Sequence, residues 1–112
     1  MDYKINTTVL LSNGSSVSDG VIVSFNPHTD AITKENKIPT DLSWFISEEA
    51  QEAGWSKVIP CTDAVKRVET QILNVYLQSD VPVNKLSYDV IQQYGLIWLE
   101  GIYGSGNVQI LN

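Results

Sequence analysis

Few side chains in this 112-residue chain could do chemistry, and its single histidine is the first of them. His28 follows Pro27 in an expected turn and has Asp30 two residues further on. Such a pair could give a metal two ligands, but a structural zinc site needs four, and no second histidine or cysteine cluster exists. We therefore interpret His28 as an exposed turn residue and expect no metal site and no cofactor.

The single cysteine, Cys61, excludes an intrachain disulfide and a multi-cysteine zinc site. It follows Pro60 at the end of an expected strand, with no pattern nearby that indicates an activating base. A lone cysteine is by default buried and inert, and we predict this for Cys61.

Sequence motifs for catalysis are also absent: the chain contains no G-x-S-x-G, no H-E-x-x-H and no G-x-x-x-x-G-K-[ST]. We expect no catalytic residues and predict that the protein is not an enzyme.

Three carboxylates gather in the segment SEEAQEAG, residues 47–54. Glycoside hydrolysis needs two carboxyl groups facing each other about 5 to 9 Å apart across a cleft. Glu48, Glu49 and Glu52 on one helical turn would instead face solvent together. A solvated acidic turn is the simplest interpretation, and its rival is a docking site for a basic patch on a partner. Trp55, just after the turn, is the aromatic residue that we expect to reach a partner.

The negative charge of the chain is also concentrated around this segment. Its net charge is −6, and residues 38–63 hold five carboxylates and one lysine. Nucleic-acid binding is not expected, because it requires clustered basic residues and Arg67 is the only arginine. No stretch approaches 18 uninterrupted apolar residues, so we expect no membrane partner. Only 18% of residues are charged, whereas 32 are Ser, Thr, Asn or Gln, a composition that suits extensive packing against neighbours or an ordinary β-rich domain.

The elements that must position these residues are mostly strands in the first half of the chain. Period-2 patterns and turn residues predict strands at 3–11, 21–25, 38–46 and 55–60, with turns at Asn13-Gly14 and Asp19-Gly20. Pro39 indicates an edge strand or the start of one. In residues 47–54, Ser47 is the expected cap of a short helical turn and Gly54 its end.

Residues 63–78 fit two structures. Apolar residues recur at helical spacing, which favours a helix with Asp63 as its cap, while frequent β-branched residues leave a strand at 68–77 as the alternative.

The last helix is predicted to start at the cap Ser87. Its apolar stripe is Val90, Ile91, Tyr94, Ile97, Trp98 and Ile102. Gly95 inside it indicates that the helix backbone closely approaches a neighbour. Glycines 101, 104 and 106 end the helix, and a strand at 107–111 follows. Trp44 and Trp98 are expected in the core.

Several stretches resemble small virion structural proteins of tailed bacteriophages, of the tail and connector type. They are DGVIV (19–23), NPHTD (26–30), KIPTDLS (37–43), YGLIWLE (94–100) and GNVQI (106–110). The resemblance implies an oligomeric, non-enzymatic part of a particle, with no catalytic residues to transfer.

We therefore expect a single α+β domain over residues 1–112: a small antiparallel sheet or barrel with one or two packed helices. The expected function is structural, in a phage tail, connector or baseplate, with other virion proteins and further copies in a ring or lattice as partners. The expected location is the virion, assembled in the bacterial cytoplasm. Two alternatives stay open: a carbohydrate- or peptide-binding module centred on Trp55, and a small acidic inhibitor of a host protein.

Overall fold

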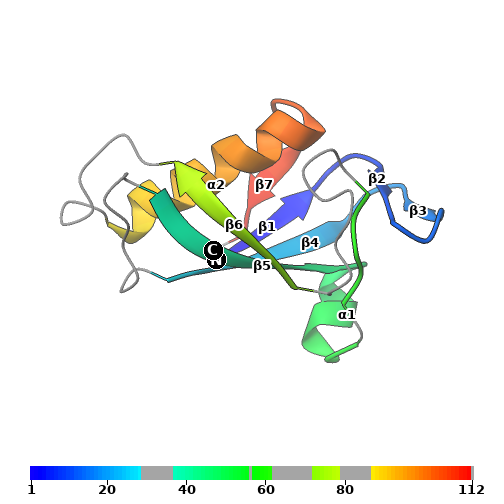
Figure 1. Cartoon of the computed structure of the whole chain (residues 1–112). Helices are drawn as coiled ribbons and strands as arrows, with labels where there is room; N and C mark the ends of the chain where they lie inside the picture. The colour runs from blue at the N-terminus through cyan, green and yellow to red at the C-terminus, as the bar shows by residue number, and fades with distance from the viewer. Residues whose placement is uncertain (29–36, 56, 62–71, 79–86, 112) are drawn as a thin grey trace.

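A computed structural model of the chain describes residues 1–28, 37–55, 57–61, 72–78 and 87–111. A five-stranded antiparallel sheet has the strand order β6-β5-β4-β1-β7. The long helix α2 lies along one face of this sheet, and the short helix α1 lies at one end, away from α2 (Figure 1). The predicted α+β class, an antiparallel sheet packed by helices, is confirmed.

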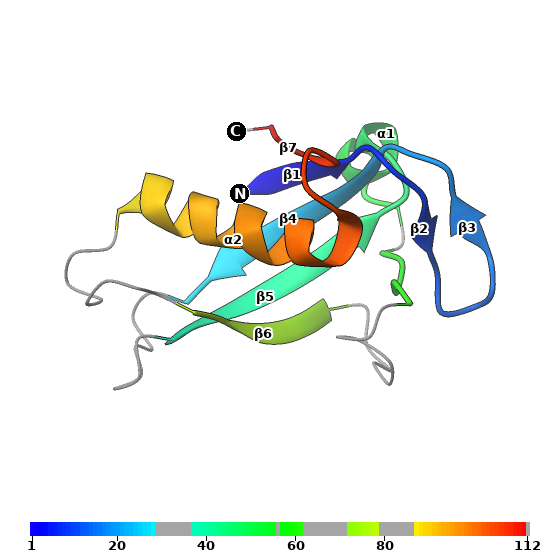
Figure 2. The same ribbon diagram turned by 90° about the horizontal axis from the view of Figure 1, so that it is seen from above.

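The strands and helices alternate only in the second half of the chain. Their order is β1 (Asp2–Ile5), β2 (Val9–Leu10), β3 (Ser16–Val17), β4 (Val21–Pro27), β5 (Lys37–Phe45), α1 (Glu48–Glu52), β6 (Ile72–Gln78), α2 (Tyr88–Tyr103) and β7 (Val108–Ile110). Strands β2 and β3 form a separate hairpin beside the end of the main sheet (Figure 2).

The single strand predicted over residues 3–11 is wrong, because the chain leaves the main sheet after β1. Ile5 pairs with Val21, so residues 6–20 have no place in the β1–β4 ladder. They form the β2–β3 hairpin instead, and Gly14 at its tip has φ +89°. The predicted turn at Asn13-Gly14 is confirmed, since glycine adopts this angle without steric cost.

Strands β4 and β5 form the centre of the sheet, and both were predicted close to their observed bounds. Alternate residues of β5 are buried, as the period-2 pattern requires: Ile38, Thr40, Leu42 and Trp44. Pro39 does not mark an edge strand, because β5 lies between β4 and β6. It lies near the strand's start, where its carbonyl accepts a hydrogen bond from the His28 amide at 2.8 Å.

The strand predicted at residues 55–60 is wrong. Val58 forms one isolated bridge with Trp44, and Pro60 forms another with Leu11. The segment crosses from the main sheet to the β2–β3 hairpin, so it has no single neighbour with which to build a ladder.

The helix favoured for residues 63–78 is wrong over residues 72–78, which form β6; the strand alternative is correct there. Residues 62–71 lie outside the described part. Pairing with β5 over seven consecutive residues decides this structure, and tertiary pairing routinely overrides local spacing.

Helix α2 begins where predicted: the Ser87 hydroxyl accepts a hydrogen bond from the Val90 amide at 3.3 Å. The predicted buried stripe is partly wrong. Ile97 is 66% exposed, and the side facing the sheet consists of Ile91, Gln92, Gly95 and Leu99. The closing strand, β7, is confirmed.

Gly95 explains why this side of α2, and not the predicted stripe, faces the sheet. A Cβ atom at this position would lie 2.8 Å from Phe25 Cε2 and would also overlap the hydroxyl of Tyr3. The missing side chain therefore lets α2 approach β1 and β4, and the Tyr3 hydroxyl donates a 2.7 Å hydrogen bond to the Gln92 carbonyl. The close approach inferred from the sequence is confirmed.

Two tyrosine hydroxyls, those of Tyr3 and Tyr103, are buried in this core and differ in their hydrogen bonding. Burial raises the pKa of Tyr3 well above its ordinary value of 10. Burial also raises the pKa of Tyr103 to about 12, partly offset by the neighbouring Trp44 indole. Unlike the Tyr3 hydroxyl, neither Tyr103 Oη nor Trp44 Nε1 makes a hydrogen bond with the described residues.

We expect the substitution Gly95→Ala to lower the free energy of unfolding by about 1 to 3 kcal/mol, because the added methyl group overpacks the contact with Phe25. The matched control is Gly101→Ala in the same helix, where a Cβ would meet nothing within 4 Å. Its higher helix propensity should raise stability by up to about 1 kcal/mol. Urea denaturation measures both, and equal effects of the two substitutions would contradict the close approach.

Alkaline pH should lower the stability of the folded protein, because its buried tyrosines resist ionisation. Tyrosines in the unfolded chain ionise near pH 10, whereas Tyr103 in the folded protein keeps its proton to about pH 12. The contribution of Tyr103 to the free energy of unfolding is therefore fully present below pH 10 and is lost as the pH rises through 12. At pH 7, Tyr3→Phe should cost about 1 kcal/mol, because it removes the bond to Gln92. Tyr103→Phe should be nearly neutral at pH 7 and should reduce the alkaline loss. Denaturation midpoints at pH 7 and pH 11 test this, and an unchanged alkaline loss in Tyr103→Phe would refute it.

Candidate functional site

The acidic helix α1 is built as its sequence predicts. The Ser47 hydroxyl accepts a hydrogen bond from the Ala50 amide at 3.1 Å, and Gly54 ends the turn with φ +70°. Glu48 and Glu49 occupy the first turn, where the helix dipole favours negative charge. Glu48, Glu49 and Glu52 are all exposed, while Ala50 is fully buried. The helix therefore holds three carboxylates outward on one fixed turn.

Two polar contacts attach α1 to strand β1. Lys4 Nζ lies 3.8 Å from Glu48 Oε1, and Gln51 Nε2 donates to Asp2 Oδ2 at 3.2 Å. Asp2 and Lys4 alternate with the buried residues of β1, so α1 lies on the sheet face opposite α2. An exposed ion pair is worth little by itself, so the burial of Ala50 and the Ser47 cap matter more for keeping α1 in place.

An open hollow of about 420 Å³ lies between α1 and the start of β4. Its lining brings Asp19, from the turn before β4, together with the three glutamates of α1, and Lys4 and Ser47 complete the wall. Four carboxylates thus surround one ammonium group. The field in the hollow is negative, so it favours a cationic group such as a lysine or arginine side chain.

Lys4 and Asp19 are members of this site that the sequence did not predict. Alternation along residues 3–5 could have placed Lys4 on the face opposite Tyr3 and Ile5. The pairing of Lys4 with Ile22 in β4, which brings β1 beside the Asp19 turn, is a tertiary contact that the local pattern does not encode.

Trp55 is 57% exposed at the end of α1 opposite Ser47. Its backbone amide donates to the Ala50 carbonyl at 2.9 Å, which fixes the chain direction where the indole emerges. Trp44 is almost fully buried, and Trp98 packs against the core with an edge contact to Phe25 at a ring distance of 6.2 Å. The structure therefore confirms Trp44 as a core residue, places Trp98 partly buried against the core, and leaves Trp55 exposed.

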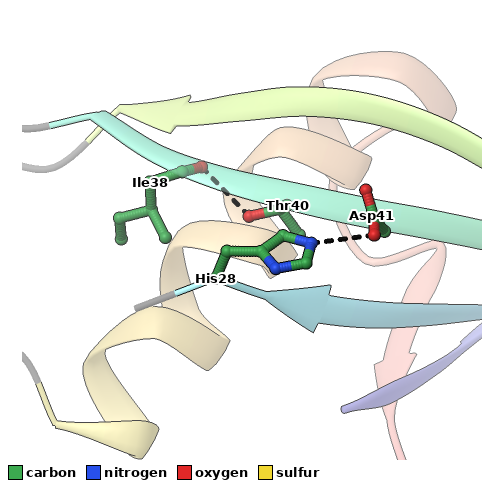
Figure 3. Close-up of polar contacts among 4 residues, drawn as sticks. All are labelled: His28, Ile38, Thr40 and Asp41. Atoms are coloured by element: carbon green, nitrogen blue, oxygen red, sulfur yellow. Dashed lines mark hydrogen bonds and ion pairs between the residues drawn. The ribbon is translucent and has the colours of Figure 1, made fainter. Parts of the chain in front are cut away.

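His28 does not project freely from a turn. Its Nε2 lies 2.8 Å from Asp41 Oδ2, so the side chain at the end of β4 reaches across to β5 (Figure 3). The Thr40 hydroxyl donates to the Ile38 carbonyl at 3.1 Å in the same view. Asp30, the residue considered as its metal partner, lies outside the described residues. His28 and Asp41 thus form a cross-strand pair, and His28 is half-buried by it.

Cys61 is exposed, and its predicted burial is wrong. Pro60 bridges Leu11 and is buried, so the next residue faces outward. Among the described residues, no group of three or more His, Cys, Asp or Glu side chains could hold a metal ion. Within the same ranges, no helix is long and apolar enough to cross a membrane.

No protein-family model, no curated protein and no solved structure matches this chain. Its function must therefore be inferred from the geometry of the site. That geometry consists of a negative hollow, an acidic helical turn and one exposed indole.

Substitution of the α1 cap tests how firmly this surface is held. We expect Ser47→Ala to lower the free energy of unfolding by about 1 kcal/mol, because the Ala50 amide loses its acceptor. Ser47→Asp retains an acceptor in the same place and should restore most of the loss. Chemical denaturation measures both variants. If Ser47→Asp were as unstable as Ser47→Ala, the cap would not be what holds α1.

Proposed function

We propose that this protein is a non-enzymatic assembly protein of a tailed-bacteriophage particle, located in its tail, head–tail connector or baseplate. It acts through protein–protein contacts with other virion proteins and with further copies of itself. The surface formed by α1, the adjoining hollow and Trp55 is the site that contacts a neighbouring protein. We call it the acidic docking surface; its residues are Lys4, Asp19, Ser47, Glu48, Glu49, Glu52 and Trp55.

One observation carries this proposal: the short helix whose glutamates line a negative hollow is followed directly by an exposed indole, and this helix is attached to the sheet. Interfaces typically combine a large aromatic contact residue with a polar rim, and tryptophan is enriched among the residues that dominate binding energy. Trp55 supplies the aromatic contact, and the carboxylates of α1 supply the charge. The favoured partner therefore presents basic side chains around an apolar pocket.

The charge distribution suits assembly in a defined orientation. Three of the carboxylates in residues 38–63 lie on α1 and Asp19 lies beside them, so attraction to a basic surface is strong at this end of the molecule. Such local complementarity increases the association rate and fixes orientation more than it raises affinity. The resemblance to small phage tail and connector proteins agrees with a role of this kind.

The same surface would also suit an acidic inhibitor that occupies a basic site on a host protein, and Trp55 alone would suit a sugar or peptide ligand. These alternatives differ from the proposal in one respect: neither requires the protein to be part of a particle. Mass spectrometry of particles purified from cells that encode the protein therefore separates them from the assembly role.

Variants of the docking surface should lower incorporation into particles. We expect Trp55→Ala to weaken the contact by about 30-fold or more, because a central tryptophan typically contributes at least about 2 kcal/mol. Glu49→Gln should weaken it by up to about fivefold, and this effect should shrink at high salt. Copy number per particle, determined by quantitative mass spectrometry, measures both.

The matched control for Glu49→Gln is Asp89→Asn, because both remove one exposed carboxylate from the first turn of a helix. Asp89 lies on α2, away from the docking surface, and its loss should leave incorporation unchanged. Equal effects of the two variants would mean that net charge matters and the docking surface does not. Absence of the protein from every purified particle, together with monomeric behaviour at all concentrations, would refute the assembly role.

A further inference from the structure

Within the part of the chain that the structure describes, strand β6 ends the five-stranded sheet on one side, next to β5 (Figure 2). The ladder fixes which backbone groups of β6 point outward. The Trp44 carbonyl accepts from the Val58 amide on the side of β5 away from β4, so even-numbered residues of β5 direct their backbone groups toward β6. Since Thr40 pairs with Val75, the odd-numbered residues of β6 bond to β5. Backbone groups of the even-numbered residues point away from the sheet: Ile72, Asn74, Tyr76 and Gln78.

Natural proteins usually protect such an edge with a charged residue, a proline, a bulge or a very short strand. The sequence of β6, ILNVYLQ, contains neither a charged residue nor a proline. Its seven residues pair with β5 in unbroken register, so no bulge twists it away. The opposite edge, β7, has only three residues and is protected by its shortness.

We infer that a second copy of this chain pairs along β6, strand against identical strand in antiparallel orientation. This inference rests on the assembly role proposed above and names one of its self-contacts. A two-fold axis perpendicular to the sheet at Val75 would set Ile72 opposite Gln78 and Asn74 opposite Tyr76. Every outward backbone group then finds a partner, and the two sheets become one continuous antiparallel sheet with both α2 helices on the same face.

Charge within β6 does not oppose the approach of a second copy at this edge. Each copy has a net charge of −6, so two copies repel where carboxylates meet. Residues 72–78 carry no charge, whereas the acidic docking surface lies at α1. Pairing along β6 therefore sets uncharged residues against uncharged residues, and the docking surface stays free for a different, basic partner.

Amide hydrogen exchange of the full chain, measured by NMR at several protein concentrations, tests the inference directly. Amides of Leu73, Val75 and Leu77 should be protected at every concentration, because they bond to β5. Amides of Asn74 and Tyr76 should exchange freely in the monomer and become at least about tenfold slower as dimers form. Protection of Asn74 and Tyr76 in the monomer would show that the edge is already covered within one copy, and would overturn the inference.

A backbone substitution gives an independent test. Asn74→Pro removes an outward amide while leaving the bonds to β5 in place, and should weaken dimerisation at least about tenfold in sedimentation equilibrium. Asn74→Ala keeps the amide and changes only the side chain, so it should dimerise like the original protein. Circular dichroism confirms that each variant is folded.

The outcomes separate this inference from the proposed function. Oligomers that form with freely exchanging Asn74 and Tyr76 amides would overturn the β6 contact and leave the assembly role standing. A β6 dimer that never enters a particle would support the contact and count against the phage role. A protein that stays monomeric at all concentrations would overturn the β6 contact, and its presence or absence in particles would then decide the assembly role.

Discussion

The contact between α2 and the sheet at Gly95 is the constraint on which the rest of the fold depends. Because residue 95 has no side chain, the helix lies close against Tyr3 and Phe25, and the Tyr3 hydroxyl bonds to the helix backbone at Gln92. These contacts tie β1 and β4 to α2, which returns the chain to β7 beside β1. The contact therefore fixes which side of α2 is buried and which face of the sheet becomes the core.

The opposite face of the sheet carries the candidate site because the first face is occupied. Alternation along β1 places Lys4 and Asp2 on the side away from α2, and both contact α1. The strands that build the core therefore also hold the acidic docking surface, because successive residues of β1 point alternately to the core and to α1. The site needs no separate scaffold, and the core strands supply its rigidity.

Features set by neighbouring residues were predicted well from the sequence. The caps Ser47 and Ser87 and the turn at Asn13-Gly14 depend on hydrogen bonds or backbone angles within a few residues. Features that depend on pairing between residues far apart in the sequence were not predicted well. Residues 72–78 have helical spacing, but β5 draws them into the sheet, and Cys61 faces outward because Pro60 bridges Leu11. A local pattern contains no record of these partners, so it could not decide between the alternatives.

The same distinction between local and long-range features applies to the candidate site. By itself the sequence determined an acidic, serine-capped turn followed by an available tryptophan, because capping, charge and helix length are local properties. Only the tertiary structure decided that Lys4 and Asp19 join the glutamates around one hollow, and that β6 lies at an edge. Strand order and register set both features, and they follow from how the whole chain buries its apolar residues around Gly95.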